Sequence, residues 1–243
     1  MSDDPAGGRR GGFFDSLEGL AHVLREPPAP AAPAPPPGRP AAADAAPHRP
    51  RLRLPIALLH VVDDGREDGE VVRLRGERVV IGRSEGDVVV PHDISMSPRH
   101  AALERLPDGW RLVDLGSAGG TFVRVTHARL RHGGEIQLGG TRLVFQEVDL
   151  TEAWLVEVRP GGGGQRHECN APGVTIGRGA AVINLSDPFV SPLHARVSRT
   201  PRGWRIENSG LNGLWVRIDG PVEMHGPSQF LCGEQRFVLE PLG

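Results

Sequence analysis

The chain has 243 residues, of which 38% are hydrophobic, and a formal net charge of −2 at pH 7. This length allows one or two domains that each bury a core, and the small net charge excludes a global attraction to nucleic acid or to an anionic membrane. Any anion-binding site must therefore be local. All 28 basic residues are arginine, a bias that we attribute to a GC-rich bacterial genome rather than to selection for guanidinium groups.

The cysteines and the apolar runs indicate the compartment. Only two cysteines occur, Cys169 and Cys232, and no C-x-x-C motif is present. This favours two core residues in a reducing compartment over a disulfide or a metal-binding pair. No apolar run has the length of a membrane span, and no basic-then-apolar signal segment begins the chain. We therefore expect a soluble, cytoplasmic protein.

The first 50 residues predict an arm and a linker. Residues 1–26 form a flexible arm, in which apolar residues recur every three or four positions and predict a short amphipathic helix over residues 13–25. Such a helix is too short to be stable alone, so it would dock on a partner, pack on the domains or fray in solvent. Residues 27–50 are mostly Pro and Ala, which predicts an extended polyproline spacer.

After residue 51 the same landmarks occur twice. The motif I-G-R ends at Arg83 and again at Arg178, and S-P-x-H begins at Ser97 and again at Ser191. The two offsets are 178 − 83 = 95 and 191 − 97 = 94. A fixed repeat of this length indicates two copies of one small domain, which we place over residues 52–148 and 152–243.

Both copies contain short apolar runs separated by Gly, Asp and Pro, without helical periodicity. In the first copy the runs predict strands over residues 54–62, 70–74, 78–81, 88–90, 101–106, 110–114, 121–125, 135–138 and 141–147. In the second copy they predict strands over residues 153–158, 165–169, 174–176, 194–199, 204–208, 214–218, 228–231 and 235–240. Many short strands at close spacing indicate an all-β fold of two antiparallel β-sandwiches in tandem.

The landmark residues fall in the predicted connections between strands. In a sandwich these connections cluster at the ends and present binding residues on a rigid scaffold. An arginine fork, serine and threonine hydroxyls and backbone amides beside glycines suit the binding of a tetrahedral oxyanion. The sequence therefore predicts an anion-binding site at the end of each sandwich.

In this order, the motifs resemble those of the forkhead-associated (FHA) domain. The first copy reads IGRS, SPRH and DLGSAGGTFV, and the second reads IGRG, SPLH and ENSGLNGLWV. The resemblance covers roughly residues 52–243. It implies two eleven-stranded β-sandwiches whose end loops bind phosphothreonine peptides, and FHA domains are among the modules that read phosphorylated motifs through arginine.

The resemblance also implies roles for individual residues. In the first copy, the implied phosphopeptide-binding positions are Arg83, Ser84, Ser97, Arg99, Gly119 and Thr121. In the second copy they are Arg178, Ser191 and Asn212. The positions with an implied structural role are Gly82, His100, Gly177 and His194, where each histidine is buried and hydrogen-bonds the loop backbone.

Each copy departs from the family pattern in a different way. The family asparagine that holds the peptide backbone is kept as Asn212 in the second copy, whereas the first copy has Gly119 there. The second copy has Gly179 and Leu214 where the first has Ser84 and Thr121. We therefore expect the first copy to be the better phosphate reader.

The leading hypothesis is a phosphothreonine-binding adaptor in Ser/Thr-kinase signalling. Its partners would be phosphothreonine-containing proteins, including a Ser/Thr kinase or its substrates, and a further partner for the helix over residues 13–25. The alternative is a scaffold that binds partners without phosphate. No Ser/His/Asp order, carboxylate pair or metal-ligand spacing occurs within one local element, so we expect no enzyme, no cofactor and no metal, and neither nucleic acid nor a membrane as partner.

Overall fold

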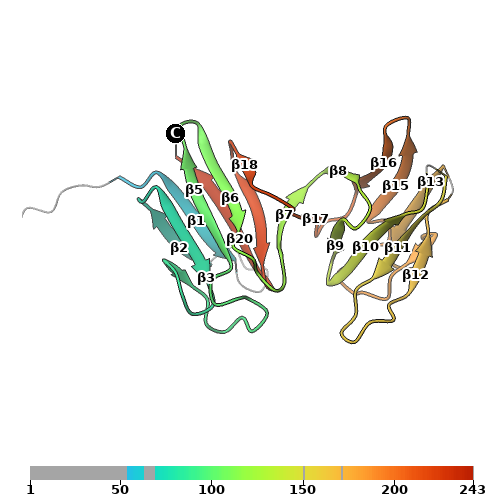
Figure 1. The fold of residues 1–243 in the computed structure, drawn as a ribbon, viewed down its shortest axis with the longest axis horizontal. Coiled ribbons are helices and arrows are strands. Elements are labelled where there is room, and N and C mark those ends of the chain that lie inside the picture. Colours follow the sequence, from blue (N-terminus) through green and yellow to red (C-terminus); the bar gives the residue numbers. More distant parts are fainter. Residues whose placement is uncertain (1–53, 63–68, 150, 171, 243) are drawn as a thin grey trace, which may run out of the picture. The chain divides into compact units, whose positions relative to one another are not determined.

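The computed structural model describes residues 54–62, 69–149, 151–170 and 172–242 (Figure 1). These residues form twenty β-strands and no helix, which confirms the predicted all-β class. No segment of them is a helix long and apolar enough to cross a membrane. The expected arm over residues 1–26, its helix over residues 13–25 and the linker over residues 27–50 lie outside the described residues.

The strands follow the predicted runs, except for three short strands over residues 127–130, 183–184 and 222–224 that no predicted run covers. The strands up to the middle of the chain are β1 (Ala57–Val62), β2 (Glu70–Leu74), β3 (Arg78–Gly82), β4 (Val88–Val89), β5 (Ala101–Leu106), β6 (Gly109–Asp114), β7 (Thr121–Val125), β8 (His127–Leu130), β9 (Glu135–Leu138) and β10 (Thr141–Glu147). The later strands are β11 (Ala153–Glu157), β12 (Arg166–Glu168), β13 (Gly173–Gly177), β14 (Ile183–Asn184), β15 (Ala195–Thr200), β16 (Gly203–Asn208), β17 (Leu214–Arg217), β18 (Val222–Met224), β19 (Ser228–Cys232) and β20 (Gln235–Pro241).

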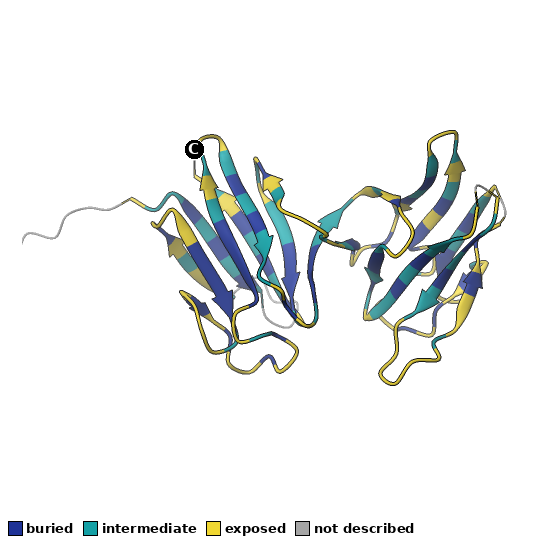
Figure 2. Cartoon of the chain, in the orientation of Figure 1, coloured by how far each residue is buried: buried dark blue, intermediate teal, exposed yellow. Residues whose placement is uncertain are grey.

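Burial alternates along the strands as a half-buried sheet requires. In β1 the side chains of Ala57, Leu59 and Val61 are buried, while Leu58 and His60 between them are only partly buried. Successive side chains of a strand point to opposite faces, so one face of β1 meets a core and the other faces outward. Strands β16 and β20 alternate in the same way, whereas β3 is buried at four successive positions (Figure 2).

The strands form one ten-stranded sheet and two five-stranded sheets. The large sheet has the order β12-β11-β10-β9-β17-β7-β19-β20-β1-β2. The smaller sheets have the orders β18-β6-β5-β3-β4 and β14-β13-β15-β16-β8. Each small sheet packs on one half of the large sheet through a hydrophobic core, so the described residues make two sandwiches of ten strands each.

The two sandwiches exchange strands. The first core combines residues of β1–β6 with Met224, Phe230, Phe237 and Leu239 from β18–β20. The second core combines residues of β11–β17 with those of β8–β10, among them Leu143. The pairing agrees with this, because β1 pairs with β20 and β10 pairs with β11. We call β1–β7 with β18–β20 the first sandwich, and β8–β17 the second sandwich.

This distribution corrects the expected contiguous domains over residues 52–148 and 152–243. Each copy keeps its first seven strands, but its last three complete the sandwich of the other copy. A single residue, Thr126, connects β7 to β8. A connection this short leaves no loop in which the chain can reverse into its own sandwich, and short hinges favour strand exchange.

Strands β7 and β17 join the two sandwiches. They occupy equivalent positions in the two copies and pair antiparallel, with Phe122 opposite Arg217 and Arg124 opposite Trp215. These two pairs are equivalent to each other, and the equivalent residues Val123 and Val216 lie opposite each other between them, so the seam has a local two-fold relation. Phe122, Trp215 and Leu231 form a third, small hydrophobic cluster on this seam.

The two cysteines lie in different cores. Cys232 belongs to the first core and Cys169 to the second, and both are buried and unpaired. This is the core position that the sequence predicted for them.

Candidate functional site

The loop that follows β3 is fastened to the loop that precedes β5. The backbone N–H of Arg83 donates to the carbonyl of Ser97 at 3.0 Å, and that of Glu85 donates to the carbonyl of Pro98 at 2.9 Å. This approach requires glycine at position 82, because a Cβ atom on Gly82 would lie 2.1 Å from the Pro98 carbonyl oxygen. The two loops thus hold Arg83 and Ser97 side by side.

His100 connects this pair of loops to a third loop, between β6 and β7. Its Nδ1 atom accepts a hydrogen bond from the N–H of Ser97 at 3.1 Å, and its Nε2 atom donates to the carbonyl of Gly120 at 3.1 Å. Burial lowers the pKa of His100, and the bond to Gly120 only partly opposes this shift. The imidazole is therefore neutral, and its two hydrogen bonds fix the spacing of the loops.

Asp114 organises the loop between β6 and β7. Its carboxylate accepts hydrogen bonds from the N–H groups of Gly116 and Ser117, both at 2.8 Å, and from the hydroxyls of Ser117 and Thr121, both at 2.6 Å. Burial would raise the pKa of Asp114, but these donors together lower it. The Oγ atom of Ser97 accepts from the N–H of Ala118 at 3.0 Å, which leaves the Ser97 hydroxyl hydrogen for another acceptor.

Arg83 lies half-buried beside these loops, and its guanidinium forms no hydrogen bond or ion pair with any other described residue. Ser84 and Arg99 next to it are exposed. A cationic fork and hydroxyl donors on neighbouring loops, with no protein acceptor for the fork among the described residues, suit a phosphate or a similar oxyanion.

The second copy repeats the frame. The N–H of Arg178 donates to the carbonyl of Ser191 at 3.0 Å, and the N–H of Ser191 donates to Nδ1 of His194 at 2.9 Å. Nε2 of His194 donates to the carbonyl of Gly213 at 3.0 Å, and the N–H of Leu211 donates to Oγ of Ser191 at 3.2 Å. As in the first copy, a Cβ atom at Gly177 would lie 2.1 Å from the carbonyl oxygen of a proline.

The functional side chains of the second site lie differently. Arg178 is exposed, and its guanidinium donates a long hydrogen bond of 3.4 Å to the carbonyl of Pro188. The side-chain amide of Asn212 donates to the carbonyl of Phe189 at 2.7 Å. Position 179, equivalent to Ser84, is a glycine with a positive φ of 104°. The second site thus has fewer side-chain donors beside its arginine.

The family model of the FHA domain matches residues 79–139 and 174–227. Each copy thus contains a segment of the FHA-domain family. Each matched segment contains the three loops of one site. We therefore call the two sites the first and second FHA sites.

Curated relatives are also similar to this chain. The chain is 37% identical over 92 residues to an oxoglutarate dehydrogenase inhibitor of Corynebacterium jeikeium, a match that covers 37% of this chain and 64% of that protein. It is 34% identical over 94 residues to the glycogen accumulation regulator GarA of Mycobacterium tuberculosis, which covers 37% of this chain and 58% of GarA. The matches span less than two thirds of each relative.

Among solved structures, the chain is similar to the FHA domain of a Chlamydia trachomatis protein. The two are 12% identical, the alignment covers 77% of this chain and 98% of the other, and the TM-score is 0.35.

The structure places one expected phosphate contact elsewhere. Thr121 is fully buried, and its hydroxyl donates to Asp114. It therefore supports the loop from beneath and does not present a donor to the phosphate position, which corrects the expectation from the resemblance. Asp114 itself was missed, although an Asp at a strand end before Gly-Ser is a typical signal of a side-chain-capped turn.

Each FHA site has one further contact with the opposite sandwich. Arg142 of β10 donates to the carbonyl of Gly119 in the first site at 2.9 Å. Arg124 of β7 donates to the carbonyl of Leu211 in the second site, also at 2.9 Å. No sequence signal predicted these contacts, because they depend on the strand exchange and on the pairing of β7 with β17.

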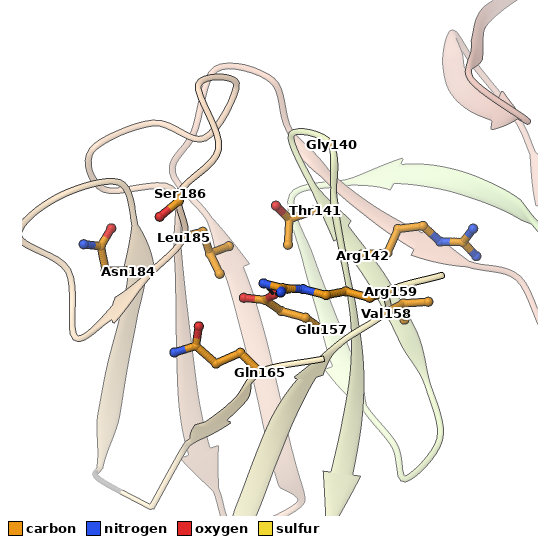
Figure 3. Close-up of a pocket in the computed structure, with 10 residues that line it drawn as sticks. All are labelled: Gly140, Thr141, Arg142, Glu157, Val158, Arg159, Gln165, Asn184, Leu185 and Ser186. Carbon is orange, nitrogen blue, oxygen red and sulfur yellow. Dashed lines mark hydrogen bonds and ion pairs between the residues drawn. The ribbon is translucent and has the colours of Figure 1, made fainter. Parts of the chain in front are cut away.

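A polar cavity of about 290 Å³ in the second sandwich is lined by residues 140–142, 157–159, 165 and 184–186 (Figure 3). Among its lining residues, the carboxylate of Glu157 accepts from Arg159 at 2.6 Å, and it also lies 3.1 Å from Nε2 of the neighbouring His167. In Figure 3 the side chain of Arg142 points away from the other lining residues. In the part of the chain that the structure describes, no group of His, Cys, Asp and Glu could hold a metal ion.

Proposed function

We propose that this protein is a phosphothreonine-peptide-binding adaptor in Ser/Thr-kinase signalling, with the first FHA site as its main reader. The observation that carries the proposal is the state of Arg83. Residue Arg83 is half-buried, its backbone N–H is fixed to the carbonyl of Ser97, and its guanidinium makes no hydrogen bond or ion pair with another described residue. A charge held this way is ready for an anionic ligand.

The comparison of the two sites favours the first. Hydrogen bonds to a charged group contribute about 1.5–3 kcal/mol each. Ser84 adds one hydroxyl near Arg83, whereas Gly179 supplies none near Arg178. Arg178 is also more exposed than Arg83, so solvent screens its charge more strongly.

The family and the relatives support a regulatory role. FHA domains recognise phosphorylated motifs through arginine, and the relatives are named as an inhibitor and as a regulator. We propose as partners proteins phosphorylated on threonine, including a Ser/Thr kinase or its substrates. The sites offer cationic and hydroxyl donors around a point open to solvent, which is an arrangement for binding rather than for catalysis.

Calorimetry on the full chain tests this proposal. A phosphothreonine peptide selected from a degenerate library would be titrated into the wild type, Arg83→Ala and Arg178→Ala, beside its unphosphorylated form. Loss of a bidentate, charge-assisted contact costs about 2–5 kcal/mol, so Arg83→Ala should weaken binding by about thirty-fold to several thousand-fold. Arg178→Ala is the matched control and should change the affinity little.

Two outcomes would contradict the proposal. The reverse ranking of the arginine variants would make the second FHA site the reader. Equal affinity of the wild type for both peptides would indicate a scaffold that binds without phosphate.

A further inference from the structure

A groove of about 760 Å³ lies on the seam where β7 pairs with β17. Its lining includes three pairs of residues that occupy equivalent positions in the two copies: Gly119 and Asn212, Ser95 and Phe189, Phe122 and Trp215. The groove is therefore built by both copies around their local two-fold relation. Its volume falls within the range of about 300–1,000 Å³ that is usual for ligand sites.

Each FHA site contributes one loop residue to the lining of this groove, from the loop between β6 and β7 or the loop between β16 and β17. Gly119 belongs to the first site and lies where the family has its backbone-binding asparagine. Asn212 of the second copy lines the same groove. Its amide nitrogen donates a hydrogen bond to the carbonyl of Phe189, but its side-chain oxygen accepts from no described residue. It is an acceptor available for a peptide N–H.

Phe189 lines the groove with an exposed aromatic side chain. Its side chain is 64% exposed. Its backbone is fixed on both sides, because its N–H donates to Asp187 at 2.8 Å and its carbonyl accepts from Asn212 at 2.7 Å. A rigid, exposed aromatic group binds an apolar partner at a low entropic cost.

We infer that a phosphothreonine peptide bound at the first site runs past Gly119 into this groove. There Asn212 binds its backbone, and Phe189 contacts a large apolar side chain that flanks the phosphothreonine. The inference rests on the proposed function and adds the specificity element. An extended peptide advances about 3.3 Å per residue, so a few residues beyond the phosphate span a groove of this size.

This arrangement explains why each copy is incomplete in a different way. The first copy keeps the phosphate ligands Arg83 and Ser84 but has Gly119 instead of asparagine. The second copy keeps Asn212 but has Gly179 beside its arginine. The strand exchange brings the loops of both copies to one groove. The phosphate-binding residues of the first copy and the backbone-binding Asn212 of the second copy therefore form one complete peptide-binding site.

The test uses the full chain with Arg178→Ala as background, so that only the first site binds phosphate. Two phosphothreonine peptides would be compared by calorimetry, one with leucine at the flanking position preferred in the library and one with alanine there. Phe189→Ala should weaken the leucine peptide about tenfold and the alanine peptide less than about twofold. Asn212→Ala should weaken both peptides by about tenfold.

Leu211→Ala is the matched control, because Leu211 is 88% exposed on the same loop and does not line the groove. It should leave both affinities unchanged. Phe189→Leu keeps an apolar contact and should retain most of the leucine preference, and thermal melts would establish that every variant folds. An unchanged leucine preference in Phe189→Ala overturns the groove assignment while the dependence on Arg83 still supports the adaptor. Equal affinity of the wild type for the phosphorylated and unphosphorylated peptides would overturn both the groove assignment and the adaptor function.

Discussion

The guanidinium of Arg142, in the second sandwich, donates a hydrogen bond to the carbonyl of Gly119, in the first FHA site, at 2.9 Å. The same side chain forms an ion pair with Glu135, which is 8% exposed and also accepts from Arg217 at 3.0 Å. The first FHA site is thus supported by a strand of its own copy that lies in the other sandwich.

We expect Arg142→Ala to affect both stability and binding. Removal of Arg142 takes one cation from the nearly buried Glu135 and one donor from Gly119, which should lower the free energy of unfolding by about 1–3 kcal/mol. Phosphopeptide affinity at the first site should fall about three- to tenfold because the loop loses its support. Urea unfolding and calorimetry would measure the two effects. Arg73→Ala, at an exposed arginine of β2, should change neither.

The strand exchange can be tested with engineered disulfides. Leu58 of β1 lies opposite Glu240 of β20, so a Leu58→Cys, Glu240→Cys variant should form an intramolecular disulfide in the monomer. In a contiguous first domain the partner of Leu58 would instead be the equivalent residue of β10, Gln146. Burial raises the pKa of Cys169 to about 12, so this thiol should not compete in mild oxidation.

Non-reducing electrophoresis of the monomer fraction, with peptide mapping, would identify the bond. The control is a Leu58→Cys, Gln146→Cys variant, which should stay reduced. A disulfide in the control and none in the first variant would show that the sandwiches are contiguous in the chain.

The sequence was sufficient for most strands and for the frame of both sites, but not for β8, β14 and β18, which have at most four residues each. Periodicity depends on neighbouring residues, and the alternation in β1 was readable from Ala57 to Val62. The positions of Gly82 and His100 follow from a local motif with fixed spacing. Strand exchange is different, because β10 and β20 carry almost the same pattern and each fits either sandwich. Only the geometry of the connection at Thr126 distinguishes the two arrangements.

The same limit applies to the site. The motif identified Arg83 and Ser97, whose positions are set by short loops. It did not identify Arg142, which is far from the motif in sequence and reaches Gly119 only through the exchanged strands. It also assigned Thr121 to the phosphate, because a motif position does not reveal which way a hydroxyl points.

Gly82→Ala should disrupt the first site. The new Cβ atom would lie 2.1 Å from the Pro98 oxygen and 2.5 Å from the Glu85 oxygen, so both loops would have to move. We expect a loss of about 1–3 kcal/mol of stability and of phosphopeptide binding. Gly220→Ala is the matched control, since no atom lies within 4 Å of its Cβ position and its φ is not positive. Equal melting temperatures for the two variants would contradict the packing described here.

His100 should make stability depend on pH. Because burial lowers its pKa in the folded state, the unfolded chain binds more protons as the pH falls. Its contribution is complete above the unfolded value of about 6.5 and is lost as the pH falls below it through the folded pKa. The free energy of unfolding should therefore decrease as the pH falls below about 7, and His100→Gln should flatten this decrease. His92→Gln, at an exposed histidine, should leave the slope unchanged.

Thr121 and Ser84 should separate structural support from ligand binding. The Thr121 hydroxyl is fully buried and donates to Asp114 at 2.6 Å. Thr121→Val keeps the shape of the side chain but removes this donor, so it should lower the free energy of unfolding by about 1–2 kcal/mol and change phosphopeptide affinity less than about twofold. Ser84→Ala removes an exposed hydroxyl beside Arg83 and should do the opposite, with an unchanged melting temperature and an affinity lowered about three- to tenfold. Urea unfolding and calorimetry on the same two preparations would compare them. A large loss of affinity in Thr121→Val without a loss of stability would place this hydroxyl on the phosphate after all, and would mean that ligand binding turns it away from Asp114.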